Sequence, residues 1–280
     1  MVIISRFLNS NKYQLSKHYP LTYVRPKKFL GQHFLNDQNI ALKIVEAINL
    51  SPGRNRIIEI GPGTGVLTKF LATNKSVDLR LVEIDSESVS FLKNHYPELR
   101  DQIVEGDFLA LNISDLFNED FIIVGNFPYN ISSQIFFKVL ELRNQVTQVV
   151  CMLQKEVAER IAEKEGSKTY GILSVLLQAY YDIEFLFKVP PGVFHPPPKV
   201  MSAVIRLTRN KTHQLACDEN LFKKVVKQAF QNRRKTLRNA LKPLTLHASI
   251  YALPVMDKRA EQLPVDQFIS LTKLIQESGE

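Results

Sequence analysis

The sequence predicts an α/β protein with a doubly wound, mostly parallel sheet followed by a small helical domain. Strand-like apolar runs alternate with helical patterns from Arg56 to about Arg209. A glycine-rich segment, Gly61–Gly65, directly follows the first of these runs. After Arg209 the strand signals disappear and apolar residues repeat at helical spacing. Alternation of strands and helices is typical of a parallel sheet with crossover helices.

Seven apolar runs are expected to form the sheet, because such runs between turn residues indicate buried strands. They are residues 56–60, 79–84, 102–105 (the weakest), 121–125, 146–153, 183–189 and 203–207. Only the proline-rich segment Val189–Pro198 separates the last two runs. A connection this short leaves no room for a helical crossover, so we expect the last strand to be antiparallel.

The chain before the first strand has two parts. Residues 1–26 show no period and predict a basic N-terminal extension. This extension is interpreted as an RNA-contacting arm or as a disordered segment without a role, with an organellar transit peptide as a further alternative. The main α/β domain is expected to begin after this extension and to span residues 27–211. Near its start, Asn36-Asp37 offers an N-cap for a helix with an apolar stripe along residues 40–48.

Residues 212–280 predict a small helical domain that binds RNA. Leu221, Val225 and Val226 repeat at helical spacing. We expect the helix to continue through Gln231–Arg238, where side chains four residues apart would share a helix face. We interpret its cations as phosphate contacts, with a solvated helix face as the alternative. These cations are Arg233, Arg234, Lys235 and Arg238, of which Arg234 and Arg238 would share that face.

Charge is distributed unevenly along the chain, whose net charge is +8. Residues 1–28 contribute +6, residues 29–189 contribute −6 and residues 190–280 contribute +8. An acidic body between basic ends fits a protein held against a polyanion. We therefore expect RNA as the partner.

Other features narrow the class of protein. The apolar runs fall short of the roughly 18 residues that span a bilayer, and the start of the chain does not resemble a secretory signal. Cys151 and Cys217 show no metal-ligand spacing, so we expect no bound metal. Cys151 lies in an apolar run and is expected to be a core thiol. We expect a monomer in the reducing cytoplasm.

The glycine segment predicts a nucleotide-like ligand. Glycines after a first strand let the backbone approach a ligand closely. Glu83, at the end of the next strand, is placed to bind ribose hydroxyls, and Asp107 follows the third strand. A site for a nicotinamide dinucleotide also has glycines after the first strand and an acid at the end of the second. This pattern alone therefore leaves an oxidoreductase open.

The most specific motif is Asn126-Phe127-Pro128-Tyr129, which directly follows the fourth strand-like run. Such a turn suits methylation of the exocyclic amine of a base. Because the lone pair of that amine is delocalised into the ring, two acceptors that bind its N–H groups help the nitrogen to pyramidalise. Asn126 offers one acceptor, Pro128 stiffens the turn, and Tyr129 offers a face for a flipped base.

Taken together, these segments resemble the family of small-subunit (16S-type) ribosomal RNA adenine N6,N6-dimethyltransferases. The resemblance runs from about Lys27 to the C-terminus in seven segments that keep the family's order. They are Lys28–Leu35, Glu59–Gly63, Gly125–Ser132, Met152–Ala158, Tyr170–Val175, Phe194–Val200 and Asn232–Thr236.

The resemblance implies a Rossmann-like S-adenosylmethionine-dependent methyltransferase fold and the roles of individual residues. It implies S-adenosylmethionine as the methyl donor, 16S rRNA of a small ribosomal subunit or its precursor as partner, and two adjacent adenines near the RNA 3′ end as targets. Asn126, Pro128 and Tyr129 are expected to be catalytic. The donor-binding set would be His33, Leu35, Gly61, Gly63, Glu83, Asp107 and Asn126. His33 departs from the family, which commonly has asparagine at this position.

Three alternatives stay open at this level. Phe194, beside the triple proline, is a candidate to pack on the target base or to fill the sheet core. Large-subunit RNA adenine dimethyltransferases of the antibiotic-resistance type share the catalytic domain. A non-catalytic ribosome-assembly or transcription factor could use the same fold, although Gly61, Glu83, Asp107 and Asn126 argue for retained activity.

Overall fold

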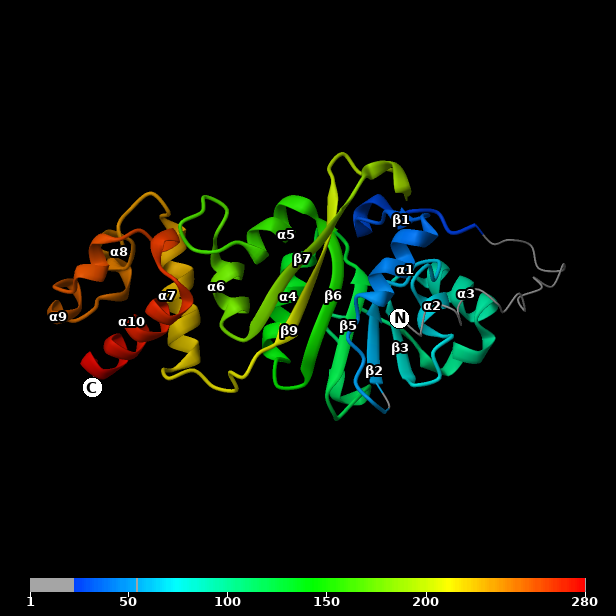
Figure 1. Ribbon diagram of the computed structural model, residues 1–280, viewed down its shortest axis with the longest axis horizontal. Coiled ribbons are helices and arrows are strands. Elements are labelled where there is room, and N and C mark those ends of the chain that lie inside the picture. The colour runs from blue at the N-terminus through cyan, green and yellow to red at the C-terminus, as the bar shows by residue number, and fades with distance from the viewer. Residues whose placement is uncertain (1–22, 54, 280) are drawn as a thin grey trace.

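A seven-stranded sheet forms the centre of the molecule (Figure 1). The computed structural model describes residues 23–53 and 55–279. The strand order is β4-β3-β2-β5-β6-β9-β7. The strands are β2 (Asn55–Ile60), β3 (Val77–Glu83), β4 (Ile103–Glu105), β5 (Phe121–Asn126), β6 (Val146–Gln154), β7 (Tyr181–Val189) and β9 (Ser202–Arg209). Each of the seven predicted runs forms one of these strands.

Strand direction follows the prediction. β9 is antiparallel to both of its neighbours, β6 and β7, while the other pairs are parallel. The chain runs outward from β2 through β3 to β4 and then returns to β5 on the other side of β2. Strand order therefore reverses between β2 and β5, and ligands of open α/β sheets bind beyond the carboxyl ends of the strands at such a point.

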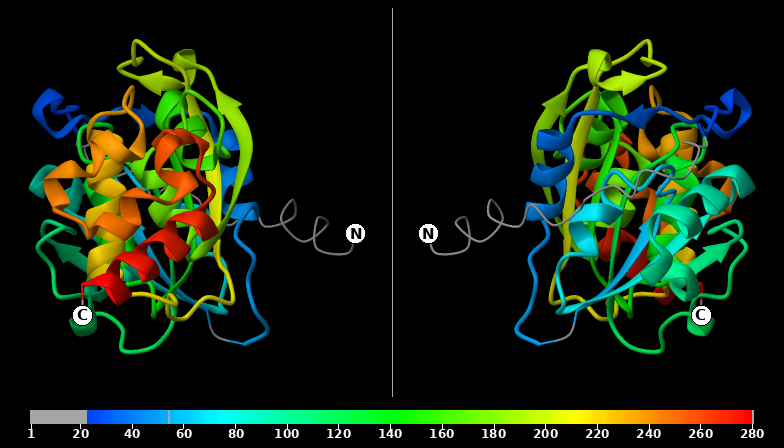
Figure 2. Two further views of the ribbon diagram at one scale, coloured as in Figure 1. Left: turned by 90° about the vertical axis from the view of Figure 1, so that its left-hand side faces the viewer. Right: turned by 90° about the vertical axis from the view of Figure 1, so that its right-hand side faces the viewer.

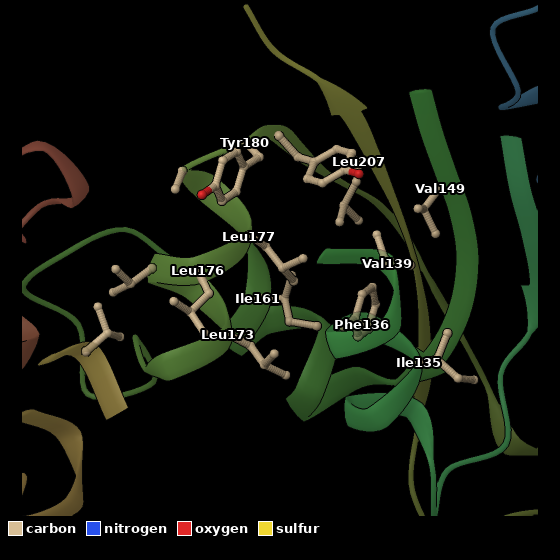
Figure 3. Close-up of a cluster of buried hydrophobic side chains, with 14 of the residues drawn as sticks. Ile135, Phe136, Val139, Val149, Ile161, Leu173, Leu176, Leu177, Tyr180 and Leu207 are labelled. Carbon is tan, nitrogen blue, oxygen red and sulfur yellow. The ribbon is translucent and has the colours of Figure 1, made fainter. Parts of the chain in front are cut away.

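Helices cover both faces of the sheet. α1 (Gln38–Glu46), α2 (Thr68–Leu71) and α3 (Ser86–His95) pack on one face, where their apolar residues join one core cluster. α4 (Ser132–Glu141), α5 (Lys155–Ala162) and α6 (Ile172–Gln178) pack on the other (Figure 3). Asp37 caps α1 as expected, accepting hydrogen bonds from the backbone of Asn39 and Ile40. Cys151 is fully buried, which confirms the core thiol.

The chain after β9 is helical and lies at one end of the molecule (Figure 1). Phe222 and Phe268 from this part belong to the same core cluster as Leu176 of α6. The α-helices are α7 (Glu219–Gln231), α8 (Leu237–Ala240), α9 (Ala248–Tyr251) and α10 (Val265–Ser278). Short 3-10 helices lie at Lys28–Leu30, Pro97–Gln102, Ile113–Asp115, Pro191–Val193, Lys242–Leu244, Pro254–Asp257 and Ala260–Gln262.

The predicted continuous helix through the cationic segment is wrong. α7 ends at Gln231 and α8 begins only at Leu237. Asn232 has φ −120° and ψ 61°, outside the helical region, and so ends α7. Arg234 and Arg238 therefore do not share a helix face.

A second, two-stranded sheet was not predicted. β1 (Phe34–Leu35) pairs antiparallel with β8 (Phe194–His195), so the N-terminal segment lies along the loop between β7 and β9 (Figure 2). Val24 is buried and the Tyr23 hydroxyl lies 3.2 Å from His195 Nε2. The rest of the predicted N-terminal extension, residues 1–22, lies outside the described residues. None of the helices in the described ranges is long and apolar enough to cross a membrane.

Candidate active site

A pocket opens beyond the carboxyl ends of β2, β3 and β5, at the point where strand order reverses. It is a hollow of about 910 Å³, counted with its open mouth. Of the predicted donor-binding and catalytic residues, the lining contains His33, Gly61, Gly63, Glu83, Asp107, Asn126, Pro128 and Tyr129. The sheet topology thus brings together side chains that are up to 96 positions apart, from His33 to Tyr129.

The glycine turn and Glu83 form the floor of the pocket. Gly63 has a φ of +57°, and a Cβ there would lie 2.8 Å from the Phe34 ring. The backbone N–H groups of Gly63 and Asp85 each donate to the Glu83 carboxylate at 2.9 Å. Burial raises the pKa of Glu83, and these backbone hydrogen bonds oppose the rise. A carboxylate accepts more than two hydrogen bonds, so Glu83 keeps acceptor capacity for a ligand.

A second carboxyl group, Glu59, lies beneath this floor. It is 1% exposed and accepts a 2.7 Å hydrogen bond from the Thr68 hydroxyl. Burial raises the pKa of Glu59 to about 8, and the nearby Glu83 carboxylate contributes to the rise. Burial thus favours the neutral form of the Glu59 carboxyl group.

The Asn126 side chain is held in one orientation. Its Nδ2 donates to the backbone carbonyl of His33 at 2.9 Å. Oδ1 is consequently the acceptor end of this amide, and it has no hydrogen-bond partner among residues 23–53 and 55–279. Because Asn126 lines the pocket, the amide presents an acceptor there.

Tyr129 and His33 lie beside each other at the pocket. Their ring centroids are 5.3 Å apart with an interplanar angle of 32°. The Tyr129 hydroxyl lies 2.5 Å from the buried Ser202 hydroxyl, and burial raises the pKa of Tyr129. His33 Nδ1 donates to the carbonyl of Pro196 at 2.7 Å. Both rings are thus anchored at their polar ends, while Tyr129 keeps an aromatic surface toward the pocket.

Asp107 is exposed at the edge of the pocket. One carboxylate oxygen accepts a 2.9 Å hydrogen bond from the backbone of Leu109. The other oxygen is available to a ligand donor such as an exocyclic amine. Ile84, which is 51% exposed, lines the pocket and offers an apolar surface near Asp107.

Sequence reasoning missed the contacts that tie the N-terminal segment to this site. Lys27 forms an ion pair with Asp85, and the Gln32 side-chain amide donates to Asp85 at 3.4 Å. Burial acts to raise the pKa of Asp85, but the hydrogen bonds from Lys27, Ser88 and Gln32 outweigh it and lower that pKa. The acid two residues after Glu83 was visible in the sequence, but its basic partner lies 58 residues away.

Two of the predicted site residues face the core instead. Leu35 is 3% exposed and is not part of the pocket lining, so its side chain does not reach the pocket, and its assignment to the donor stays a prediction. The pairing of β1 with β8 turns Leu35 inward and leaves Phe34 to line the pocket. Phe194, its partner in β8, is 4% exposed and belongs to the same core cluster. Phe194 therefore packs in the core, and a contact with the target base stays a prediction.

The four predicted phosphate-binding cations divide into two pairs. Arg233 donates to the backbone carbonyls of Ser167 and Tyr170 at 3.2 and 2.9 Å. Arg238 donates to the Tyr251 carbonyl and to Asp257, the latter at 2.7 and 3.0 Å. Arg234 and Lys235 are exposed. Arg233 and Arg238 thus hold segments of the protein together, which the sequence interpretation as phosphate contacts did not anticipate.

A difference in stability should separate these pairs. We expect Arg238→Ala to lower the free energy of unfolding by about 0.5–1.5 kcal/mol, because it removes the hydrogen bond to the Tyr251 carbonyl and a solvent-screened ion pair with Asp257. Arg234→Ala, the matched control, should change it by less than about 0.5 kcal/mol. Denaturant titration of both variants measures this difference. Equal stability of the two variants would contradict the structural role of Arg238.

The fold and the pocket define the class of the protein. The sheet is mostly parallel, and one pocket at its reversal point brings together a glycine turn, an acid at the end of β3 and an Asn-Phe-Pro-Tyr turn. This is the architecture of a Rossmann-like methyltransferase.

Comparisons with known proteins specify the family. The family model for ribosomal RNA adenine dimethylase matches residues 24–277. A ribosomal RNA small subunit methyltransferase A from Cytophaga hutchinsonii is 56% identical over 252 residues, covering 90% of this chain and 98% of its own. A dimethyladenosine transferase from Plasmodium falciparum has a similar structure, with TM-score 0.72, 25% identity and coverage of 88% of this chain and 98% of its own. The 23S rRNA methyltransferase ErmE gives TM-score 0.61 at 25% identity, covering 85% of this chain and 99% of its own.

This chain therefore belongs to the ribosomal RNA adenine dimethylase family and is a methyltransferase enzyme. The glycine turn alone also allowed a nicotinamide-dependent oxidoreductase, but the family match shows a methyltransferase instead.

Proposed function

We propose that this enzyme transfers methyl groups from S-adenosylmethionine to N6 of two adjacent adenines near the 3′ end of 16S rRNA, giving N6,N6-dimethyladenines. The observation that carries the proposal is the Asn126 amide, fixed by the His33 carbonyl so that Oδ1 serves as an acceptor in the pocket that Tyr129 also lines. The choice of small-subunit RNA rests on the relative named for that subunit, which is 56% identical over 98% of its length. The substrate would be a small subunit or its precursor in the cytoplasm, and the enzyme would act as a monomer in small-subunit biogenesis.

The pocket residues fit the proposed donor. When bound, S-adenosylmethionine supplies an electrophilic methyl group on a sulfonium centre. The remaining acceptor capacity of Glu83 suits ribose hydroxyls, and the outer oxygen of Asp107 suits the donor's adenine amine. Ile84 would pack on the adenine ring. None of these contacts requires a metal, and the described residues contain no group of three His, Cys, Asp or Glu side chains suited to hold one.

Asn126 and the turn after it would orient the acceptor amine. Asn126 Oδ1 accepts one N–H of the target adenine, and a backbone carbonyl of the turn accepts the other. The amine nitrogen then becomes pyramidal and its lone pair points toward the donor. Tyr129, fixed by Ser202, stacks on the flipped base. No general base is needed, because the amine becomes acidic only after methylation and water can take that proton.

Analysis of the reaction product tests this proposal. Wild-type enzyme, labelled donor and under-methylated small subunits should give label in N6,N6-dimethyladenosine near the 3′ end of 16S rRNA. The structural similarity to ErmE makes a large-subunit substrate the second candidate. Large subunits therefore serve as the parallel substrate, and label found only in large-subunit RNA would overturn the small-subunit assignment.

Asp107 provides a separate test of the donor site. We expect Asp107→Ala to weaken donor binding by about 1–3 kcal/mol, because the variant cannot form the charge-assisted hydrogen bond to the donor. Affinity for RNA should not change. Titration calorimetry with the donor measures the effect, and Asp115→Ala, which removes a carboxylate outside the pocket lining, is the control. Unchanged donor affinity in Asp107→Ala would remove Asp107 from the site.

The division of labour along the chain is part of the proposal. Residues 27–211 would bind the donor and carry out catalysis, while residues 212–280 would bind RNA. The excess of positive charge in residues 190–280 supports this division.

A further inference from the structure

A groove on α7 gathers positive charge outside the active site. It is lined by Asn220, Lys223, Lys224, Lys227, Gln228 and Gln231. The opposite side of α7 carries its buried residues, including Phe222 and Val226, so the lysines lie on the helix face turned away from the core. The side chains in this lining are lysines and amides, and none is acidic or apolar.

The lysines of the groove are not neutralised by neighbouring acids. Within the described part of the chain, Lys223, Lys224 and Lys227 form no ion pair. The two acids at the start of α7 are engaged elsewhere: Asp218 caps the helix, and Glu219 pairs with Arg143. Three cations without an acidic partner in one groove leave a local excess of positive charge.

Two of these cations are held over an aromatic ring of α4. The ammonium groups of Lys223 and Lys227 lie 5.7 and 5.0 Å from the centroid of the Phe137 ring. A ring face attracts a cation and restricts where it can lie. Lys223 and Lys227 are therefore partly pre-positioned, unlike lysines that extend freely into solvent.

The same helix, α4, connects the groove with the active site. Asn130 and Ile131 line the catalytic pocket, and α4 begins at the next residue. Ser133 and Gln134, both exposed, precede Phe137 by four and three residues and so lie on the same helix face. At 1.5 Å per residue, Phe137 lies about 9 Å along the helix from Ile131. The groove is thus within reach of an RNA molecule whose target base occupies the pocket.

We propose that this α7 groove binds the phosphate backbone of the substrate RNA, in a region flanking the methylated adenines. The proposal rests on the RNA substrate of the proposed function and adds a binding surface that Arg233 and Arg238 do not provide. Lysine ammonium groups bind phosphate as point charges. The amides of Asn220 and Gln231 can bind phosphate oxygens or ribose hydroxyls. The Gln228 amide connects α7 to α8, because its Nε2 donates to the Ala240 carbonyl at 2.9 Å.

An RNA backbone fits the groove better than a protein partner does. Energetically dominant contacts between proteins usually place an aromatic or aliphatic anchor in a desolvated pocket. The groove lining offers no apolar pocket for such an anchor. Its charge instead suits a polyanion, whose binding is driven by release of counterions.

The salt dependence of RNA binding tests the proposal. In the test variant, Lys223, Lys224 and Lys227 are all replaced by glutamine, which removes charge while keeping residues that favour a helix. The log–log slope of affinity against salt should flatten by about 2–3, at about 0.7–0.9 for each phosphate that is no longer neutralised. Replacement of the same three lysines by arginine should retain the wild-type slope. Binding is measured with under-methylated small subunits over a series of salt concentrations.

A matched control makes the same charge change at three lysines outside the α7 groove. Lys43 of α1, Lys75 before β3 and Lys93 of α3 are replaced by glutamine; the slope should change by less than about 1. Donor affinity, measured by calorimetry, should stay at the wild-type value in all variants. A slope for the α7 variant equal to that of the control would overturn the proposal. So would weaker binding with an unchanged slope, because phosphate contacts would then not be the cause.

The same experiment distinguishes this inference from the proposed function. Wild-type enzyme that methylates small subunits while the α7 variant keeps the wild-type slope would refute the groove alone. Wild-type enzyme that leaves small subunits unmethylated would refute the proposed function. In that case, a flattened slope in the α7 variant would still establish the groove as an RNA-binding surface.

Discussion

Asn126→Ala should reduce the rate of methyl transfer by at least about 100-fold and leave donor affinity close to the wild-type value. The missing acceptor matters most as the adenine amine pyramidalises, so the effect falls on the chemical step. The donor contacts proposed for Glu83 and Asp107 do not involve the Asn126 amide. Single-turnover transfer measures the rate, and titration calorimetry measures donor binding.

Asn130→Ala is the matched control for this variant. Asn130 lies four residues further on, also lines the pocket, and its amide donates to the Phe29 carbonyl at 3.3 Å. Truncation of Asn130 removes an amide of the same size but keeps the acceptor, Asn126 Oδ1. We expect transfer to fall by less than about tenfold, since the interactions that stabilise the transition state stay in place. Near-normal single-turnover transfer by Asn126→Ala would remove Asn126 from the chemistry.

Gly125→Ala should damage both stability and catalysis. A Cβ at Gly125 would lie 2.5 Å from the Ile60 carbonyl oxygen, which is backbone of the neighbouring strand and cannot rotate away. β2 and β5 must therefore separate where they form the pocket. We expect the free energy of unfolding to fall by about 1–3 kcal/mol, as for other overpacked sites. A displacement of Asn126 of about 1 Å would in addition slow methyl transfer by about 100-fold.

Gly192→Ala is the control for Gly125→Ala. No heavy atom lies within 4 Å of a Cβ built at Gly192, and its φ is not positive. Thermal or denaturant unfolding should therefore show a change below about 0.5 kcal/mol. If Gly125→Ala unfolded like Gly192→Ala and kept its activity, the close approach of β2 and β5 would not constrain the site.

Much of the fold followed from local patterns in the sequence. The seven strands were found within a few residues of their ends because buried strands need continuous apolar runs. The antiparallel direction of β9 followed from the short connection before it. Asn126, Pro128 and Tyr129 were expected in one turn at a strand end because they are close neighbours in the sequence, and all three line the pocket.

Features that depend on contacts between distant segments could not be found in this way. One example is that the side chain of Phe34, and not that of Leu35, lines the pocket. Alternate side chains of a strand point to opposite faces, so the pairing of β1 with β8 decides which side chain reaches the pocket. The order of residues around Leu35 contains no signal for that pairing. The carbonyl of His33 that fixes Asn126 is likewise supplied by a segment 93 residues away.

The sequence by itself determined the sheet, the Asn-Phe-Pro-Tyr turn at the end of β5 and the excess of positive charge in residues 190–280. Only the tertiary structure decided which cations are free to meet a ligand. Arg233 and Arg238 donate to backbone carbonyls of other segments, whereas Lys223, Lys224 and Lys227 gather in a groove beside Phe137. The physical reason is that strand and turn propensities depend on neighbours along the chain. The partner of a long charged side chain depends instead on which distant segments the folded core brings within hydrogen-bonding distance.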